Sequence, residues 1–357
     1  MILFHDHFTT MFDLNNLLRE NIKNLVPYSS ARSEFSGEAR IFLDANENSY
    51  GSPLSSWYNR YPDPLQLEVK EKLSTIKHVP VPNIFLGNGS DECIDVLYRS
   101  FCEPGADNVI TTPPTYGMYD VSARINDIRI RQVPLTPSYQ LDVPAIDEAI
   151  DDHTKMIFLC SPNNPTGNSL QREDIEIILN NYFGLVVIDE AYINFSRHRS
   201  FIQELAEYPN LVVLQTLSKA WGLAALRIGM AFASQQIIEV MNKVKPPYNI
   251  NQPSQELALK ALEEVDQVND TIRQIVEERE LLSRQLAELP LVQEVYPSDA
   301  NFLLVKMNNA KQVYDALLEN GIVVRDRSKV IHCEDCLRIT VGTKAENQEL
   351  LSRLQNF

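Results

Sequence analysis

Lys219 is a candidate nucleophile. It lies in the stretch 216–222 (TLSKAWG), just after the apolar run 211–214. A lysine kept in apolar or cationic surroundings has a lowered pKa, so its neutral amine can attack a carbonyl and form a Schiff base. Taken alone, Lys219 is more simply interpreted as a solvated surface charge. The residues after the neighbouring apolar runs decide between the two interpretations.

Asp189 ends another apolar run, 185–188. An isolated ionised carboxylate is costly to bury, so Asp189 needs a cationic partner or it becomes protonated. A protonated pyridine nitrogen is such a partner, and the pairing keeps the ring an electron sink. Tyr192, three residues later, can reach a phenolic oxygen on the same ring. The alternative is that Asp189 caps the following segment.

A phosphate site is indicated by two further stretches. Arg227, together with Thr216 and Ser218, supplies a positive charge and hydroxyl groups. Ser90 and Asp91 follow a glycine where a strand is expected to turn into a helix, and free N–H groups at a helix start attract phosphate. An ordinary turn in which Ser90 or Asp91 caps the helix is the alternative.

Asn164 lies in the loop 161–167 (SPNNPTG), which follows a further apolar run. Two prolines and a glycine fix such a loop, so they can aim the amide at an oxygen on a ring; the alternative is a merely rigid turn. One lobe thus offers a partner for a ring nitrogen, two for a ring oxygen, an amine and a phosphate site. This set predicts pyridoxal 5'-phosphate held by Lys219 as a Schiff base.

The pattern from about 65 to 245 alternates short β-branched runs with helix-length segments. Such alternation predicts a mostly parallel sheet covered on both faces, with ligands at the carboxyl ends of its strands. Helices are expected over 65–77, from 90 through 98, and after 117. Strands are expected at 84–86, 109–111, 129–133, 156–160, 185–188, 211–214 and 228–232, the last being antiparallel or at an edge.

The flanking segments predict three parts of the chain. Residues 1–27 show helical spacing up to Pro27, and residues 252–289 are expected to form one long helix or a kinked pair. A smaller α+β lobe follows, with strands at 301–306, 321–325 and 336–341, and helices at 310–319 and the C-terminus. The predicted domains are an N-terminal arm joining the small lobe (1–45), a large cofactor-binding domain (46–247), and a linking helix with the small domain (248–357).

Composition restricts the partners and the compartment. The chain has 357 residues, which suits two packed lobes, and a formal net charge of -16, which argues against nucleic acid or an anionic membrane. Five sparse cysteines predict no disulfide framework, and the pair Cys333 and Cys336 is not expected to bind a metal. Neither a signal peptide nor an apolar run of ~20 residues is found, so a cytoplasmic protein is expected.

These motifs together resemble the fold-type I, pyridoxal phosphate-dependent aminotransferases of the class-II group, most closely the histidinol-phosphate aminotransferases. They span nearly the whole chain, and their combination is highly specific. The motifs are 43–48 (LDANEN), 61–64 (YPDP), 87–92 (GNGSDE), 113–119 (PPTYGMY), 161–167 (SPNNPTG), 187–192 (VIDEAY), 216–229 (TLSKAWGLAALRIG) and 336–342 (CLRITVG).

The resemblance implies a role for each matching residue. Lys219 is the Schiff-base lysine and proton carrier, and Asp189 pairs the ring nitrogen. Asn164 and Tyr192 bind the ring hydroxyl, and Tyr116 stacks on the ring. The cofactor phosphate is held by Ser90, Asp91, Thr216, Ser218 and Arg227, and by Tyr61 of a neighbouring subunit. A homodimer with shared active sites is therefore implied.

The resemblance also implies the substrates. Arg338 and Arg325 match arginines that bind substrate anions, and Tyr28 and Asn46 match residues near the substrate. The implied reaction converts L-histidinol phosphate and 2-oxoglutarate into imidazole-acetol phosphate and L-glutamate by ping-pong chemistry, in histidine biosynthesis. The alternatives are an aromatic or broad-specificity aminotransferase, a phosphothreonine decarboxylase, and a non-catalytic sensor, which would need a fused basic module that is not found.

Overall fold

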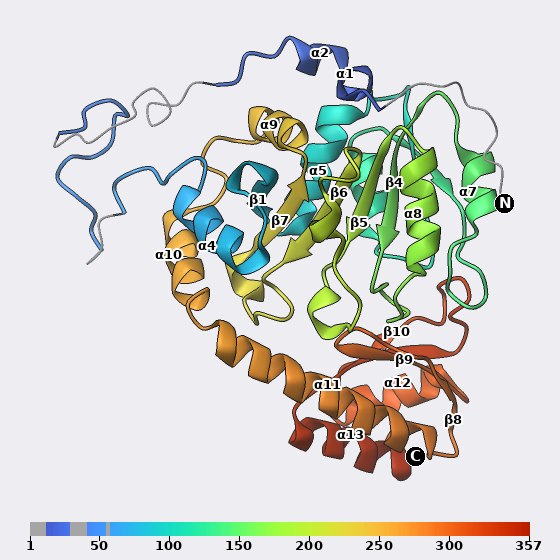
Figure 1. Ribbon diagram of the computed structural model, residues 1–357. Coiled ribbons are helices and arrows are strands. Elements are labelled where there is room, and N and C mark those ends of the chain that lie inside the picture. Colours follow the sequence, from blue (N-terminus) through green and yellow to red (C-terminus); the bar gives the residue numbers. More distant parts are fainter. Residues whose placement is uncertain (1–11, 29–40, 55–57) are drawn as a thin grey trace.

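The computed structural model describes residues 12–28, 41–54 and 58–357 of the chain (Figure 1). A large lobe is built around a seven-stranded sheet, and a small lobe around a four-stranded one. In Figure 1 the small lobe lies below the large one, and a long helix, α11, runs from the side of the large lobe down to it. The predicted two-lobed α/β fold is confirmed.

The large sheet has the strand order β1-β7-β6-β5-β4-β2-β3. Strands β2 to β6 run parallel to one another, whereas β7 is antiparallel to both β1 and β6. The antiparallel direction of 228–232 is therefore confirmed, but β1 forms the edge beside it. The strands are β1 (Ile84–Asn88), β2 (Asn108–Thr111), β3 (Arg129–Gln132), β4 (Thr154–Cys160), β5 (Leu185–Asp189), β6 (Leu211–Thr216) and β7 (Ile228–Ala233).

Helices cover both faces of this sheet, and each face has its own apolar cluster. Ile188 of β5 packs in the cluster that contains Ile178 of α8, whereas its neighbour Val187 packs in the cluster that contains Leu97 of α5. Burial on both faces explains why the strands are continuous apolar runs. The helices are α4 (Leu67–Lys77), α5 (Ser90–Phe101), α6 (Met118–Ile125), α7 (Val143–Ala149), α8 (Arg172–Asn181), α9 (Gln235–Val244) and α10 (Gln252–Ala261), with 3₁₀ turns η1 (Val81–Asn83), η2 (Ile193–Phe195), η3 (Phe201–Glu204) and η4 (Ala224–Leu226).

The small lobe packs three helices on one face of an antiparallel sheet of order β10-β11-β9-β8. Leu282 of α11, Val305 of β9 and Leu350 of α13 share its core. The segment 252–289 is a pair of helices, because α10 ends before α11 begins. The elements are α11 (Val265–Ala287), β8 (Val292–Val295), β9 (Phe302–Met307), α12 (Ala310–Glu319), β10 (Arg325–Asp326), β11 (Cys336–Thr340) and α13 (Lys344–Gln355).

The N-terminal arm differs from its prediction. Its described part holds two one-turn helices, α1 (Leu14–Leu17) and α2 (Glu20–Lys23), so the single helix over 1–27 is wrong there; residues 1–11 lie outside the described residues. The helix breaks because the backbone N–H of Arg19 donates to Ser100 O (3.2 Å) and its guanidinium to Arg99 O (3.1 Å). These contacts place the arm on α5 of the large lobe instead of on the small lobe. The predicted domain boundaries stay a prediction.

Three global properties follow from the described residues. None of their helices combines the length and apolar character needed to cross a membrane. All five cysteines are buried free thiols. Within the described ranges, no three histidine, cysteine, aspartate or glutamate side chains cluster as metal ligands would.

Gly229 of β7 lies directly beneath the turn that starts α5. A Cβ added to Gly229 would lie 2.1 Å from the backbone N of Ser90 and 2.2 Å from the carbonyl carbon of Gly89. Both neighbours are backbone, which cannot move without displacing the helix start. The absence of a side chain at Gly229 therefore sets how closely β7 approaches the glycine-rich turn.

We expect Gly229→Ala to destabilise the protein by about 1–3 kcal/mol or more, the usual cost of overpacking. The change displaces the start of α5, and thermal unfolding should show a lower Tm than that of the wild type. Gly117→Ala is the matched control, because a Cβ there meets no atom within 4 Å. An equal Tm for both variants would contradict the close approach.

Candidate active site

One cavity lies at the carboxyl ends of β4, β5 and β6, whose last residues Cys160, Asp189 and Thr216 all line it. This is the position at which open parallel sheets bind ligands. The structure brings together ten residues that the sequence analysis singled out. They are Ser90, Asp91, Tyr116, Asn164, Asp189, Tyr192, Thr216, Ser218, Lys219 and Arg227.

Asp189 is a buried carboxylate whose oxygens are held in fixed positions. Its Oδ2 accepts a hydrogen bond from the Tyr119 hydroxyl (2.7 Å), and its Oδ1 accepts one from the backbone N–H of Ala191 (3.0 Å). Burial raises the pKa of Asp189, and these hydrogen bonds and the charge of Lys219 oppose that rise only in part. The carboxylate therefore lacks charge compensation, and a cation placed beside it would be strongly favoured.

Sequence reasoning missed Tyr119, although it lies in the quoted motif 113–119. Its ring is fully buried, stacks on Phe158 (4.9 Å between centroids), and meets the edge of Tyr116 (5.6 Å). The three-residue spacing of Tyr116 and Tyr119 was the available signal, because residues three apart near a helix start share a face. Tyr116 in turn donates its hydroxyl to Asp91 Oδ1 (3.0 Å), which fixes its ring at the cavity wall.

Lys219 opens into the cavity from the turn after β6. Its Nζ lies 5.6 Å from the centre of the Tyr192 ring. Burial lowers the pKa of Lys219, and the nearby charge of Arg338 lowers it further, whereas Asp189 raises it. The result is a larger fraction of neutral amine at neutral pH, as a nucleophile or a proton acceptor requires.

The opposite end of the cavity gathers groups that suit an anion. Arg227 adopts a left-handed backbone conformation (φ 55°), and its guanidinium lies 3.5 Å from both Ser218 Oγ and Asp91 Oδ2. Gly89 donates its N–H to Arg227 O (2.7 Å), and a Cβ on Gly89 would lie 2.5 Å from the Arg227 guanidinium. The twelve-residue helix α5 begins there, with Ser90 as its first residue. Backbone donors, a hydroxyl and a cation therefore converge.

The small lobe meets the wall of this cavity through Arg338 on β11, although neither Arg338 nor Arg325 is among the residues that line the cavity. Arg338 donates a hydrogen bond to Asn164 Oδ1, and its guanidinium lies over the Phe302 ring, 5.3 Å from the centre. Arg325 pairs with Arg338 across β10 and β11, but its side chain is exposed. The two lobes thus contribute adjoining polar groups to one site.

Three residues singled out by the sequence lie elsewhere in the single chain. Tyr61 stacks on Tyr248 (4.6 Å, 14° between planes) and, with Asn46, lines a second cavity. Tyr28 is 76% exposed. None of these three lines the Lys219 cavity in the described chain.

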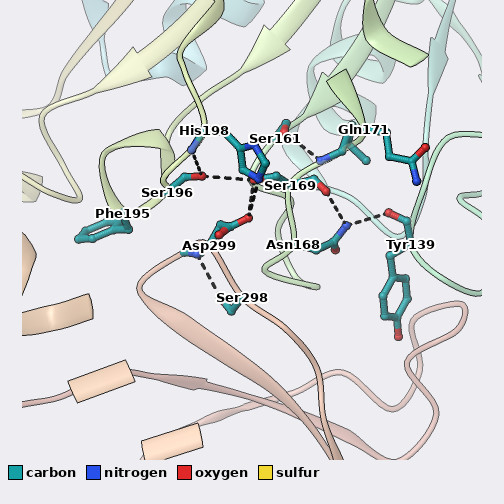
Figure 2. Close-up of polar contacts among 12 residues, drawn as sticks. Tyr139, Ser161, Asn168, Ser169, Gln171, Phe195, Ser196, His198, Ser298 and Asp299 are labelled. Atoms are coloured by element: carbon teal, nitrogen blue, oxygen red, sulfur yellow. Dashed lines mark hydrogen bonds and ion pairs between the residues drawn. The ribbon is translucent and has the colours of Figure 1, made fainter. Parts of the chain in front are cut away.

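A polar junction between the lobes lies beside the site and was not predicted (Figure 2). Asp299 of the small lobe donates its N–H to Gly167 O (2.7 Å), and its Oδ2 accepts a hydrogen bond from Ser169 Oγ (2.7 Å). His198 Nε2 lies 3.7 Å from the same carboxylate oxygen. Gly167 ends the loop that carries Asn164, so the junction fixes this loop relative to the small lobe. Its partners are over a hundred residues apart, which no local pattern reveals.

Comparison with known proteins identifies the family. The model of the family described as aminotransferase class I and II matches residues 47–354. This chain belongs to that family. It is 55% identical over 346 residues to a histidinol-phosphate aminotransferase of Cytophaga hutchinsonii, covering 97% of this chain and 99% of the relative. It is also 55% identical over 347 residues to one of Parabacteroides distasonis, with coverage of 97% and 99%.

A solved structure supports the same fold. Histidinol-phosphate aminotransferase from Sinorhizobium meliloti, in complex with pyridoxal-5'-phosphate, superimposes with a TM-score of 0.77 at 23% identity, covering 87% of this chain and 89% of that one. The predicted family and fold class are confirmed. Members of the family use pyridoxal phosphate, so the predicted cofactor is confirmed as well.

We expect Asp189→Asn to stabilise the cofactor-free protein at neutral pH, by roughly 1–3 kcal/mol, the cost of a buried group with too few partners. An unfolded aspartate has a pKa of ~3.9, and burial raises the pKa of Asp189 in the folded state. The stability that Asp189 contributes is therefore full below pH ~4 and is lost as pH rises through the folded-state pKa.

Urea unfolding midpoints measured from about pH 4 to pH 8 test this expectation. The gain of Asp189→Asn over the wild type should grow with pH. Asp152→Asn is the control, because Asp152 is exposed and lies outside the cavity. A gain that stays constant across this range would show that the Asp189 carboxylate does not carry the effect.

Proposed function

We propose that this chain interconverts L-histidinol phosphate and 2-oxoglutarate with imidazole-acetol phosphate and L-glutamate, as a histidinol-phosphate transaminase of histidine biosynthesis. The observation that carries the proposal is one cavity that combines Lys219, Asp189 and the anion-binding end at Arg227, beside Arg338 of the small lobe. Identity of 55% with relatives of that name supports it.

The residues present fit pyridoxal phosphate. Asp189 is a buried carboxylate without an ion-pair partner in the described chain, and a protonated pyridine nitrogen would supply the missing charge. Gly89 leaves free the space beside Arg227 that a side chain would fill, so the phosphate can approach the backbone there. When bound, pyridoxal phosphate supplies the electron sink that stabilises negative charge on the amine-bearing carbon of the substrate.

The residues that the sequence analysis named would hold this group. Tyr116 would lie against the ring, and Asn164 and Tyr192 would bind its hydroxyl. Tyr192 is held by an edge contact with Phe302 of the small lobe (5.1 Å). The first N–H groups of α5, at Ser90 and Asp91, would bind the phosphate together with Thr216, Ser218 and Arg227.

Lys219 also moves the proton. The pKa of Lys219 is lowered, so its Nζ can accept the proton from the amine-bearing carbon of the substrate. The same Nζ then gives the proton back to the reacting group at a neighbouring carbon. Because Arg338 helps to lower this pKa, a substrate anion bound at Arg338 also modulates the basicity of Lys219. The second half-reaction uses the same groups in reverse, which is ping-pong chemistry.

Substrate anions are bound from the small-lobe side. Arg338 and Arg325 face each other across two strands, and planar guanidinium groups accommodate either a carboxylate or a phosphate in two parallel hydrogen bonds. Glutamate brings a side-chain carboxylate, and histidinol phosphate brings a phosphate. Tyr28 and Asn46 complete the substrate site in this proposal.

We propose a homodimer with shared active sites. The segment 41–54 extends away from both lobes (Figure 1) and exposes large apolar side chains, among them Ile41, Leu43 and Leu54. Water-exposed apolar area of this extent favours a partner surface. Tyr61 then reaches the cofactor phosphate of the other subunit.

A cytoplasmic location is part of the proposal, because five buried free thiols suit a reducing compartment.

The absorption spectrum of the cofactor-loaded protein tests the substrate assignment. Histidinol phosphate alone should convert the cofactor band to that of the aminated form, and 2-oxoglutarate should restore it. If phenylalanine converts the cofactor band and histidinol phosphate does not, the family assignment stands and the substrate assignment is wrong. Release of CO₂ from O-phospho-L-threonine would instead favour the decarboxylase.

We expect Lys219→Ala to lower kcat by at least about 10²-fold, because the proton carrier is lost. The absorption band of the bound cofactor should also differ from that of the wild type, because the variant has no Lys219 amine to form the Schiff base. Lys260→Ala serves as the control, since Lys260 is an exposed residue of α10. Wild-type kcat in Lys219→Ala would refute the role.

Shared active sites predict complementation between two defective variants. Coexpressed Lys219→Ala and Tyr61→Ala chains should recover about a quarter of wild-type activity, because random pairing makes half the dimers mixed, each with one intact site. Coexpressed Lys219→Ala and Asp189→Asn chains should recover no activity. Lys219 and Asp189 of one chain serve the same site, so every site of a mixed dimer keeps one defect. Equal activity of the two mixtures would reject the shared site.

A further inference from the structure

A third arginine lies next to the pair formed by Arg325 and Arg338. Arg327 follows β10 directly, and its backbone N–H donates to Cys336 O of β11 (2.9 Å), which extends the strand pairing by one residue. Alternate residues of a strand share a face. Arg327 therefore lies on the same face as Arg325, opposite Cys336 and beside Arg338.

This face points toward the large lobe. Cys336, and Leu304 opposite Arg338, belong to the apolar cluster that contains Ile157 of the large sheet. The intervening residue Leu337 belongs instead to the core of the small lobe. The three arginines thus stand on the side of the small sheet that meets the cavity, where Tyr192 and Arg327 are close enough to shift each other's pKa.

The three guanidinium groups lack anionic partners. Across 12–28, 41–54 and 58–357, no aspartate or glutamate forms an ion pair with any of them. Arg327 Nε is buried without a hydrogen-bond partner. Elsewhere the chain pairs such groups, as with Arg172 and Glu204. Burial and the charge of Arg325 lower the pKa of Arg327, and Cys333, Tyr192 and Asp326 oppose this shift only in part, so an anion bound beside Arg327 would be favourable.

We propose that Arg327 is a specificity-determining residue that selects the phosphate dianion of the substrate over a carboxylate. A phosphate monoester carries about −1.5 to −2 charges near pH 7 and three acceptor oxygens, whereas a carboxylate carries one charge and two oxygens. Three guanidinium groups match the charge and the oxygens of a phosphate monoester, whereas two suffice for a carboxylate. Arg327 supplies the third of these groups, and its Nε has no hydrogen-bond partner within the described chain. This inference rests on the proposed function.

The test separates the two substrates of one enzyme. Arg327→Gln in the cofactor-loaded protein should raise KM for histidinol phosphate about 10–100-fold, the loss of a hydrogen bond to a charged group. KM for glutamate should change less than about threefold, and kcat should not change. Isothermal titration with inorganic phosphate should show a matching loss of affinity. Arg327→Lys keeps the positive charge, so it should recover part of the KM for histidinol phosphate and part of the affinity for inorganic phosphate.

Lys329→Gln is the matched control, because it removes one positive charge from an exposed position two residues away. Equal rises of KM for both substrates in Arg327→Gln, or no rise at all, would overturn the inference. Should Arg327→Gln fail to fold, Arg327→Lys carries the comparison through the ratio of the two KM values.

The proposed function can fail independently of the role proposed for Arg327. If the wild type reacts with glutamate but not with histidinol phosphate, the substrate assignment is wrong. The phosphate affinities of wild type and Arg327→Gln then still decide whether Arg327 binds the dianion.

Discussion

The uncompensated carboxylate of Asp189 is the constraint on which the site depends. It lies at the buried end of a central strand, where water cannot solvate it, and one hydroxyl and one backbone N–H hold its oxygens in place. Such a group is costly to bury and becomes favourable only with a cation beside it. The surrounding sheet, with Tyr119 packed against Phe158, keeps the carboxylate rigid enough to define where the positive end of a ring must lie.

The other groups are arranged at fixed distances from that point by separate strands and turns. The lysine, the amide and the anion-binding turn come from different strand ends, and the small lobe adds guanidinium groups from the open side. The contacts that tie this lobe to the large one near the chemistry include Arg338 with Asn164 and Asp299 with Ser169. The geometry of the cavity is therefore a property of both lobes together.

Much of this could be predicted from the sequence, because strand-end motifs of a parallel sheet converge without knowledge of distant contacts. Nine of the ten cavity residues were found in this way, and Tyr116 was named through the family resemblance alone. Within the described residues 12–27 the single predicted helix is wrong, because helical spacing does not reveal the hydrogen bond from the Arg19 N–H to Ser100 O. Asp299 was missed because its partners are far away in the sequence, and Tyr119 was missed although its spacing from Tyr116 was an available signal. Tyr61 depends on a second subunit in the proposed assembly, and the roles of Tyr28 and Asn46 stay predictions.

The bond between Arg338 and Asn164 joins the substrate side of the site to the cofactor side. Arg338 is assigned to the substrate anion and Asn164 to the ring hydroxyl, so one hydrogen bond connects the two assignments. The loop that carries Asn164 is also held by the small lobe, because Asp299 donates its N–H to Gly167 O. A displacement of the small lobe would therefore affect both ends of the substrate site together.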